Sequence, residues 1–127
     1  MAGYDSTLTG AQMQEAAEWA NNAPGYGAYP TVNKGTSTAS TTLEPNTFYT
    51  WGVVGSVTIS GFGAGTTKDT GTKEYIFQFT SNSGGTTTLS LPSSVKWTGG
   101  SEPTIEANTV YQVSVVNNMA LYASFPA

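Results

Sequence analysis

The chain has 127 residues and a formal net charge of −4, with four lysines, no arginine and eight acidic residues. It contains no cysteine, which excludes disulfides and thiolate sites. It also contains no histidine, which argues against most zinc sites and against histidine-based catalysis. The charge balance disfavours nucleic acid as a partner, no apolar run is long enough to span a membrane, and the N-terminus lacks a signal peptide, so we expect one soluble domain with no cofactor and no metal.

Residues 9–22 form the one predicted helix. Thr9 and Gln12 fit a capping box, and Pro24 follows as a stop signal. The helix is short and its apolar stripe is thin, so it must dock on the β-domain, on another copy of itself or on a larger partner. The residues predicted for assembly or docking are Leu8, Met13, Ala16, Ala17, Trp19 and Ala20. For Trp19, packing on its own domain and an intermolecular contact are left as equal alternatives.

A linker rich in glycine, proline and tyrosine follows the predicted helix. Tyr26 and Tyr29 join the predicted docking set, although residues of this kind more often pin a linker to the domain surface. We therefore assign residues 1–30 to an N-terminal helix and linker for assembly or docking, and residues 31–127 to a β-domain. The 21 threonines, 13 serines and 15 glycines disfavour helix in that domain and suit strands joined by turns.

The β-domain contains an internal repeat. When residues 34–60 are aligned with residues 96–122, nine of 27 positions are identical. At the centre of each copy, a Glu, a Pro or Ala, and an Asn suit a type I turn, because Pro presets φ and Asn tolerates the bridge or the left-handed region of backbone conformation. Each copy is therefore predicted as a hairpin of strand, turn and strand.

Alternation along the strands predicts which side chains face the core. Thr50 and Gln112 are expected to face outward. The residues expected to face inward are Tyr49, Trp51, Val53, Val57 and Ile59 in the first copy, and Tyr111, Val113, Val115, Met119 and Leu121 in the second.

Between the two copies, residues 74–80 give the strongest strand signal, with Tyr75, Phe77 and Phe79 on one face. A turn leads from it to residues 87–91, and this pair is predicted as a further hairpin. About eight short strands separated by turns predict a mainly β fold: an antiparallel β-sandwich, jelly-roll-like, with a short N-terminal helix. A small closed barrel is the alternative.

Glu44 and Glu106 are the candidate carboxylate pair for glycosidase chemistry, because they occupy equivalent turns. Equivalent positions in two copies of a repeat need not approach each other, so we predict no catalytic residues and no enzyme. Trp97 lies before the small polar residues 98–100, a setting that suits stacking on a sugar. Packing at the rim of the domain is the preferred interpretation, and a glycan contact at Trp97 is the alternative.

The runs 43–52, 75–81, 89–97 and 106–118 resemble, in order and spacing, a β-domain of tailed-bacteriophage virion proteins, among them head fibres and tail fibres. The similarity covers roughly residues 40–125. It implies a structural protein, a capsid-decorating head fibre or fibre-like homotrimer bound to phage capsid or tail proteins. It also implies localisation to the virion, with assembly in the bacterial cytoplasm and exposure on the particle. The alternative that it implies is a carbohydrate-binding or receptor-binding module of a tail fibre, with a host surface glycan as partner.

Overall fold

The computed structural model describes residues 29–65 and 71–127, and in these residues it contains strands and no helix. The predicted helix at 9–22 lies outside the described residues, as do its predicted docking residues. The strands are β1 (Thr31–Gly35), β2 (Thr41–Leu43), β3 (Phe48–Val54), β4 (Ser56–Phe62), β5 (Glu74–Ser81), β6 (Thr88–Ser90), β7 (Lys96–Trp97), β8 (Thr109–Val116) and β9 (Met119–Pro126).

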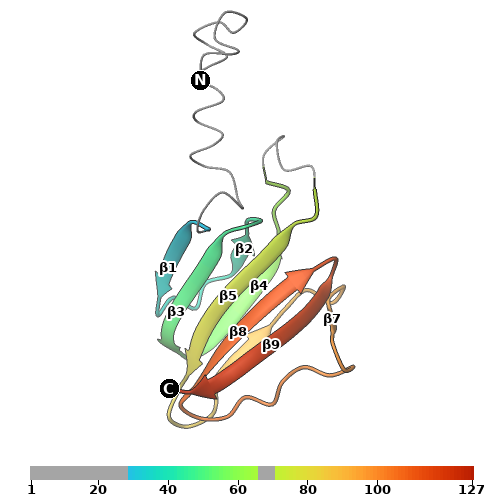
Figure 1. The fold of residues 1–127 in the computed structure, drawn as a ribbon. Coiled ribbons are helices and arrows are strands. Elements are labelled where there is room, and N and C mark those ends of the chain that lie inside the picture. Colours follow the sequence, from blue (N-terminus) through green and yellow to red (C-terminus); the bar gives the residue numbers. More distant parts are fainter. Residues whose placement is uncertain (1–28, 66–70) are drawn as a thin grey trace, which may run out of the picture.

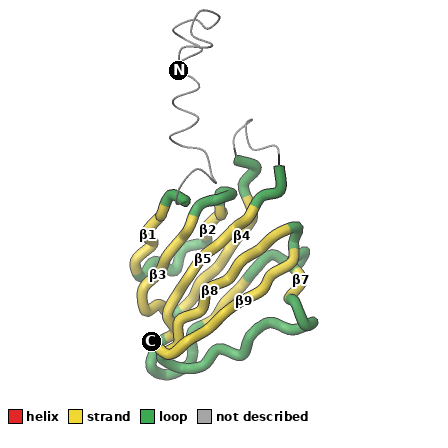
Figure 2. Tube along the Cα trace, viewed as in Figure 1, coloured by secondary structure: helices red, strands yellow, loops and turns green. Residues whose placement is uncertain are grey.

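The strands form two sheets that lie one behind the other (Figure 1). The larger has the order β1-β3-β5-β8-β9-β7 and the smaller has the order β2-β4-β6. Pairing is parallel within β1-β3-β5, within β2-β4-β6 and between β7 and β9, whereas β8 pairs antiparallel with both β5 and β9. The predicted mainly β fold is confirmed, but the sheets are mixed rather than antiparallel. Figure 2 shows the same strands joined by loops alone in the described part of the chain.

Most of the predicted hairpins are wrong, because consecutive strands from β1 to β6 alternate between the two sheets. β3 and β4 are joined by Gly55 alone, yet β3 pairs with β1 and β5 while β4 pairs with β2 and β6. Likewise β5 and β6, predicted as a hairpin, lie in different sheets. Each connection is therefore an arch, in which two successive strands face each other through side chains and not through backbone hydrogen bonds.

The second copy of the repeat differs from the first in the arm before its turn. In the first copy this arm is β2, which pairs with β4. In the second copy Pro103 stands where the first has Thr41, and a proline has no N–H to donate to a neighbouring strand. Gly99 and Gly100 adopt φ values of 87° and 90°, which turn the chain away after β7. Residues 98–106 therefore form a loop and not a strand.

The turns themselves are preserved in both copies. The hydroxyl of Tyr49 accepts a hydrogen bond from the backbone N–H of Glu44 at 2.9 Å, and the hydroxyl of Tyr111 accepts one from the N–H of Glu106 at 2.7 Å. Each tyrosine ties the start of its turn to the strand that follows. The repeat is thus a repeated corner, which joins the two sheets in the first copy and leads from the loop 98–106 into β8 in the second.

The asparagines at the two corners adopt the left-handed conformation, one of the two predicted for them. The predicted type I turn is wrong, because it needs a negative φ at this position. Asn46 and Asn108 have φ values of 55° and 50°, in the left-handed region that asparagine tolerates better than most residues. In each turn the following threonine hydroxyl donates to the carbonyl two residues earlier, from Thr47 to Pro45 and from Thr109 to Ala107.

Removing the corner hydroxyls tests this arrangement. We expect Tyr111→Phe to lower the free energy of unfolding by about 1–3 kcal/mol and Tyr49→Phe by about 0.5–1.5 kcal/mol. The larger effect follows because the Tyr111 hydroxyl also donates to the carbonyl of Thr104 at 3.2 Å. Urea denaturation of both variants measures the difference. The absence of any loss would contradict a stabilising role for the corners, and equal losses would contradict the added contribution of the Tyr111 bond to Thr104.

The core lies between the sheets and largely follows the predicted alternation. The predicted residues that are buried are Tyr49, Trp51, Val57, Ile59, Phe77, Phe79, Tyr111, Val113 and Val115. Val53 is an exception and is 57% exposed, because an irregularity in the pairing with β5 between Thr50 and Val53 turns Val54 inward instead.

Met119 and Leu121 were predicted to face inward, and this prediction is wrong. β8 and β9 form a true hairpin through Asn117 and Asn118, both with positive φ. Directly paired residues of an antiparallel hairpin share a face, so the inward Val115 carries its partner Ala120 into the core. Met119 and Leu121 flank Ala120 and therefore point outward.

Candidate functional sites

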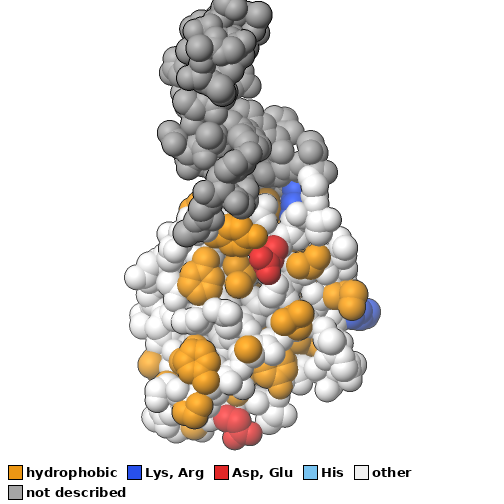
Figure 3. All heavy atoms as spheres, in the orientation of Figure 1, with side chains coloured by type: hydrophobic (Ala, Val, Ile, Leu, Met, Phe, Trp, Pro, Cys, Tyr) orange, Lys and Arg blue, Asp and Glu red, His pale blue; other side chains and the backbone are white. Residues whose placement is uncertain are grey.

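The outer face of the six-stranded sheet, which points away from the smaller sheet, carries two apolar rows. Strand register sets the members of each row side by side across β3, β5, β8 and β9. The first row is Val53, Thr80, Val110 and Phe125, and the second is Phe48, Ile76, Ser114 and Leu121. Figure 3 shows hydrophobic side chains spread over this face. We call these two sets the outer rows.

The outer rows end in exposed side chains at the β9 edge. Leu121 and Phe125 of β9 are 56% and 53% exposed, and Met119 beside them is 59% exposed. A polar row that includes Gln78 and Gln112 lies between the two apolar rows, and the amides of these two residues are 3.3 Å apart. Large hydrophobic side chains gathered on one open face are typical of an interaction surface.

Charge on this face is sparse among the described residues and gathers beyond Leu121, where Glu74 and Lys96 lie in the row of Met119. The Glu74 carboxylate accepts hydrogen bonds from the hydroxyl of Ser114 at 2.6 Å and from that of Tyr29 at 3.1 Å. The rest of the face is therefore close to neutral.

Tyr29 is the one predicted docking residue that the structure describes, since Tyr26 lies outside the described residues. Its hydrogen bond to Glu74 ties the chain just before β1 to the start of β5. Burial, this hydrogen bond and the charge of Glu74 together raise the pKa of the Tyr29 phenol above its ordinary value of 10.0. A docking contact at Tyr29 remains a prediction.

The raised pKa gives a stability change at high pH. A phenol whose pKa is higher in the folded than in the unfolded chain stabilises the fold fully below the unfolded pKa, and this stabilisation is lost as pH rises through the folded value. We therefore expect the difference in free energy of unfolding between the native chain and Tyr29→Phe to shrink above pH 10. Denaturation of both proteins at pH 8 to 11 measures it, and a difference that does not change with pH would contradict the contact.

A groove of about 460 Å³ lies between β9 and the loop 98–106. Its wall includes Thr98, Glu102, Thr104, Glu106, Tyr122 and Ser124. The groove opens on the inner side of the sheet, opposite to the outer rows, because Tyr122 and Ser124 alternate with the outward Leu121 and Phe125.

Trp97, the predicted candidate for a glycan contact, packs partly buried against the core beside this groove. Its ring meets that of Tyr122 edge-on, with centroids 6.1 Å apart. Tyr122 lines the groove and was missed from the sequence. Only the pairing of β7 with β9 brings it next to Trp97, and a spacing of 25 residues along the chain carries no signal of that pairing. A direct glycan contact of Trp97 remains a prediction.

The two glutamates of the repeat have different surroundings. The Glu44 carboxylate lies against Gly63, in the space that a Cβ at Gly63 would occupy. Glu106 instead lines the groove. Among residues 29–65 and 71–127, no cluster of three or more acidic residues is arranged to hold a metal ion, and no helix is long and apolar enough to span a membrane.

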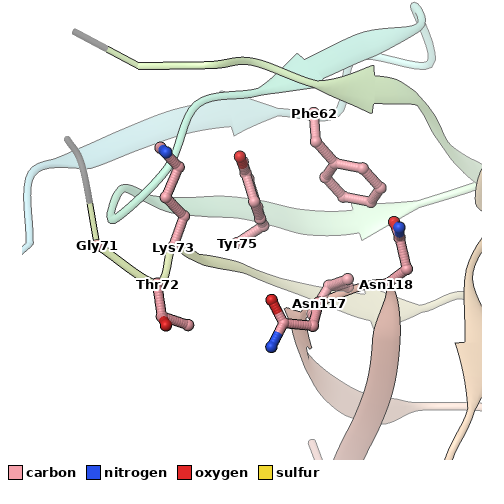
Figure 4. Close-up of a pocket in the computed structure, with 8 residues that line it drawn as sticks. Phe62, Gly71, Thr72, Lys73, Tyr75, Asn117 and Asn118 are labelled. Carbon is pink, nitrogen blue, oxygen red and sulfur yellow. The ribbon is translucent and has the colours of Figure 1, made fainter. Parts of the chain in front are cut away.

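A second, smaller cavity of about 280 Å³ lies where β4 and β8 end and β5 begins (Figure 4). Phe62 and Tyr75 lie next to each other there, with ring centroids 4.8 Å apart, near the Asn117 and Asn118 turn. The Tyr75 hydroxyl donates to the carbonyl of Gly63 at 2.7 Å. We assign this cavity no ligand.

Comparison of the chain with protein-family models, with curated proteins and with solved structures finds no match.

Proposed function

We propose that this chain is a structural protein of a tailed-bacteriophage particle, a head-fibre-like or capsid-decorating domain that self-associates through its β-domain. The fold that we propose for it is a two-layer β-sandwich built from mixed strands. In this proposal the chain carries no enzyme activity, its partners are other copies of itself and the capsid or tail proteins that hold it, and its location is the virion surface. The resemblance of residues 40–125 to phage fibre domains supplies the phage assignment and the trimer.

The exposed side chains of the outer rows, together with Met119 beside them, are the observation that carries the proposal. Val53, Met119, Leu121 and Phe125 are each more than half exposed, and covering side chains of this size stabilises an interface by roughly 1 kcal/mol each. About 4 kcal/mol is therefore available from four side chains before the half-buried members of the rows are counted. Because the face is nearly neutral, a second copy of the same chain meets little charge repulsion there.

The absolute mass of the intact chain, measured by light scattering over a concentration series, tests the proposal. We expect three times the subunit mass of 13.2 kDa. A chain that starts at Thr31 has a smaller subunit, and it should still measure three times its own subunit mass if the outer rows form the interface. It should measure as a monomer if residues 1–30 form it. A monomer at every concentration would overturn self-association. The phage assignment is tested separately, by searching for peptides of this chain in purified particles by mass spectrometry.

A second candidate function is that of a carbohydrate-binding or receptor-binding module of a tail fibre. The groove beside Tyr122 favours it, because it combines an exposed aromatic ring with free carboxylates. The two functions are compatible, since the groove and the outer rows lie on opposite sides of the six-stranded sheet.

A further inference from the structure

The groove beside β9 exists because the second copy of the repeat leaves its arm unpaired. In the first copy the equivalent arm is β2, which is hydrogen-bonded to β4. In the second copy, Pro103 and the two glycines after β7 prevent the equivalent arm from pairing as β2 does, so residues 98–106 form a loop. The space between this loop and β9 is the groove. The first copy's arm is therefore a paired strand, whereas the second copy's arm is a loop that lines a concave surface.

Tyr122 forms an oriented aromatic wall in this groove. Its side chain is 43% exposed, and two rings hold it from the protein side: Trp97 at 6.1 Å and 80°, and Tyr111 at 6.1 Å and 44°. Tyr111 is in turn held at its hydroxyl by Glu106 and Thr104. A ring supported in this way loses little side-chain freedom when a ligand covers it, which favours binding.

The polar groups of the groove are mostly acceptors. Glu102 and Glu106 are exposed, and neither carboxylate has a hydrogen-bond or ion-pair partner among the described residues. Thr104 and Ser124 also line the groove, and no lysine does. Two free carboxylates without a cation repel phosphorylated and other anionic ligands, and they suit a ligand that offers several hydroxyl donors.

We propose that this groove binds a neutral saccharide of one or two hexose units, with one face of a sugar ring stacked on Tyr122 and sugar hydroxyls donated to Glu106 and Glu102. Its volume of about 460 Å³ falls within the range of roughly 300–1,000 Å³ that is usual for small-molecule sites. The open, polar wall suits a ligand that binds weakly and gains strength when several copies of the chain act together. This inference concerns a different surface from the outer rows and does not depend on the assembly state.

Titration of the full chain with sugars, followed by amide NMR, tests the proposal. The neutral probes are methyl glucoside, methyl galactoside, methyl mannoside, N-acetylglucosamine and cellobiose, and glucose 6-phosphate serves as the anionic comparison. We expect at least one neutral probe to shift the amides of Thr104, Tyr122 and Ser124 in a saturable way, and glucose 6-phosphate to bind more weakly than methyl glucoside.

Variants assign the binding to the groove. Tyr122→Ala should weaken it about tenfold, the size expected for loss of one aromatic contact. Tyr122→Phe should retain it, since it keeps the ring and its packing against Trp97. Glu106→Gln should weaken it several-fold without loss of stability, because the contacts of Glu106 to the fold are made by its backbone.

Ala123→Ser is the matched control, since Ala123 neighbours Tyr122 on the same strand, faces the other side of the sheet and lies in the polar row of Gln112. It should leave sugar binding unchanged. The proposal is overturned if no neutral probe shifts the groove amides, or if Tyr122→Ala in a folded protein binds as well as the native chain. Light scattering of the same samples reports assembly separately, so failure of the sugar site and failure of self-association can be told apart.

Discussion

Phe77→Ala is expected to lower the free energy of unfolding by about 3–5 kcal/mol, as is usual when a fully buried phenylalanine is truncated. Phe77 is 0% exposed and lies on β5, the strand that joins the parallel half of the large sheet to its antiparallel half. Its ring meets Trp51 edge-on at 6.1 Å and lies 6.4 Å from Phe79. The cavity left by alanine would therefore open between the two sheets, where rigid aromatic neighbours relax little.

Urea denaturation of Phe77→Ala measures this loss, and Gln78→Ala is the matched control on the next residue of the same strand. Gln78 faces outward, and its side-chain amide oxygen accepts an exposed hydrogen bond from the side-chain amide of Gln112. We expect Gln78→Ala to lower the free energy of unfolding by less than about 1 kcal/mol. A comparable loss in both variants would mean that the inward face of β5 is not the centre of the core.

The double variant Leu121→Lys with Phe125→Lys is expected to weaken self-association by about 100-fold or more. Each substitution removes roughly 1–1.5 kcal/mol of apolar burial, and each places a charge that must be desolvated at the interface. Both side chains are exposed in the single chain, so the fold itself should be retained. Light scattering gives the assembly state, and thermal melting monitored by circular dichroism confirms folding.

A control with the same added charge is Ser83→Lys with Ser93→Lys, two exposed positions in turns away from the outer rows. It should assemble like the native chain, because only its net charge has changed. If the Leu121 and Phe125 variant still assembles, the interface lies elsewhere, and residues 1–30 become the next segment to test.

Local chemistry explains the parts of the structure that were predictable. Alternation with a period of two placed Tyr111, Val113 and Val115 in the core, because successive side chains of any strand point to opposite faces. The turn residues Asn46 and Asn108 were also identified from local chemistry, since tolerance of positive φ is a property of the residue itself. The repeat was also visible, because its corners need the same residue types in both copies.

The candidate sites were less accessible to sequence reasoning. Trp97 was chosen for its neighbours in the chain, but the ring that lines the groove is Tyr122, brought there by the pairing of β7 with β9. The outer rows were missed because Leu121 was placed in the core by analogy with the first copy. The other residues predicted for assembly lie outside the described residues, apart from Tyr29, and their role remains a prediction.

By itself the sequence determined that the chain is mainly β, which side chains of most strands are apolar, and where two turns with left-handed asparagines lie. Only the tertiary structure decided which strands pair. A hairpin and an arch both place alternate residues on one side, so the pattern of residues 43–62 fits either connection. The choice depends on hydrogen bonds between strands far apart in sequence, and it makes the first copy cross between sheets while β8 and β9 form a hairpin. That difference turns Leu121 outward and leaves the groove open beside Tyr122.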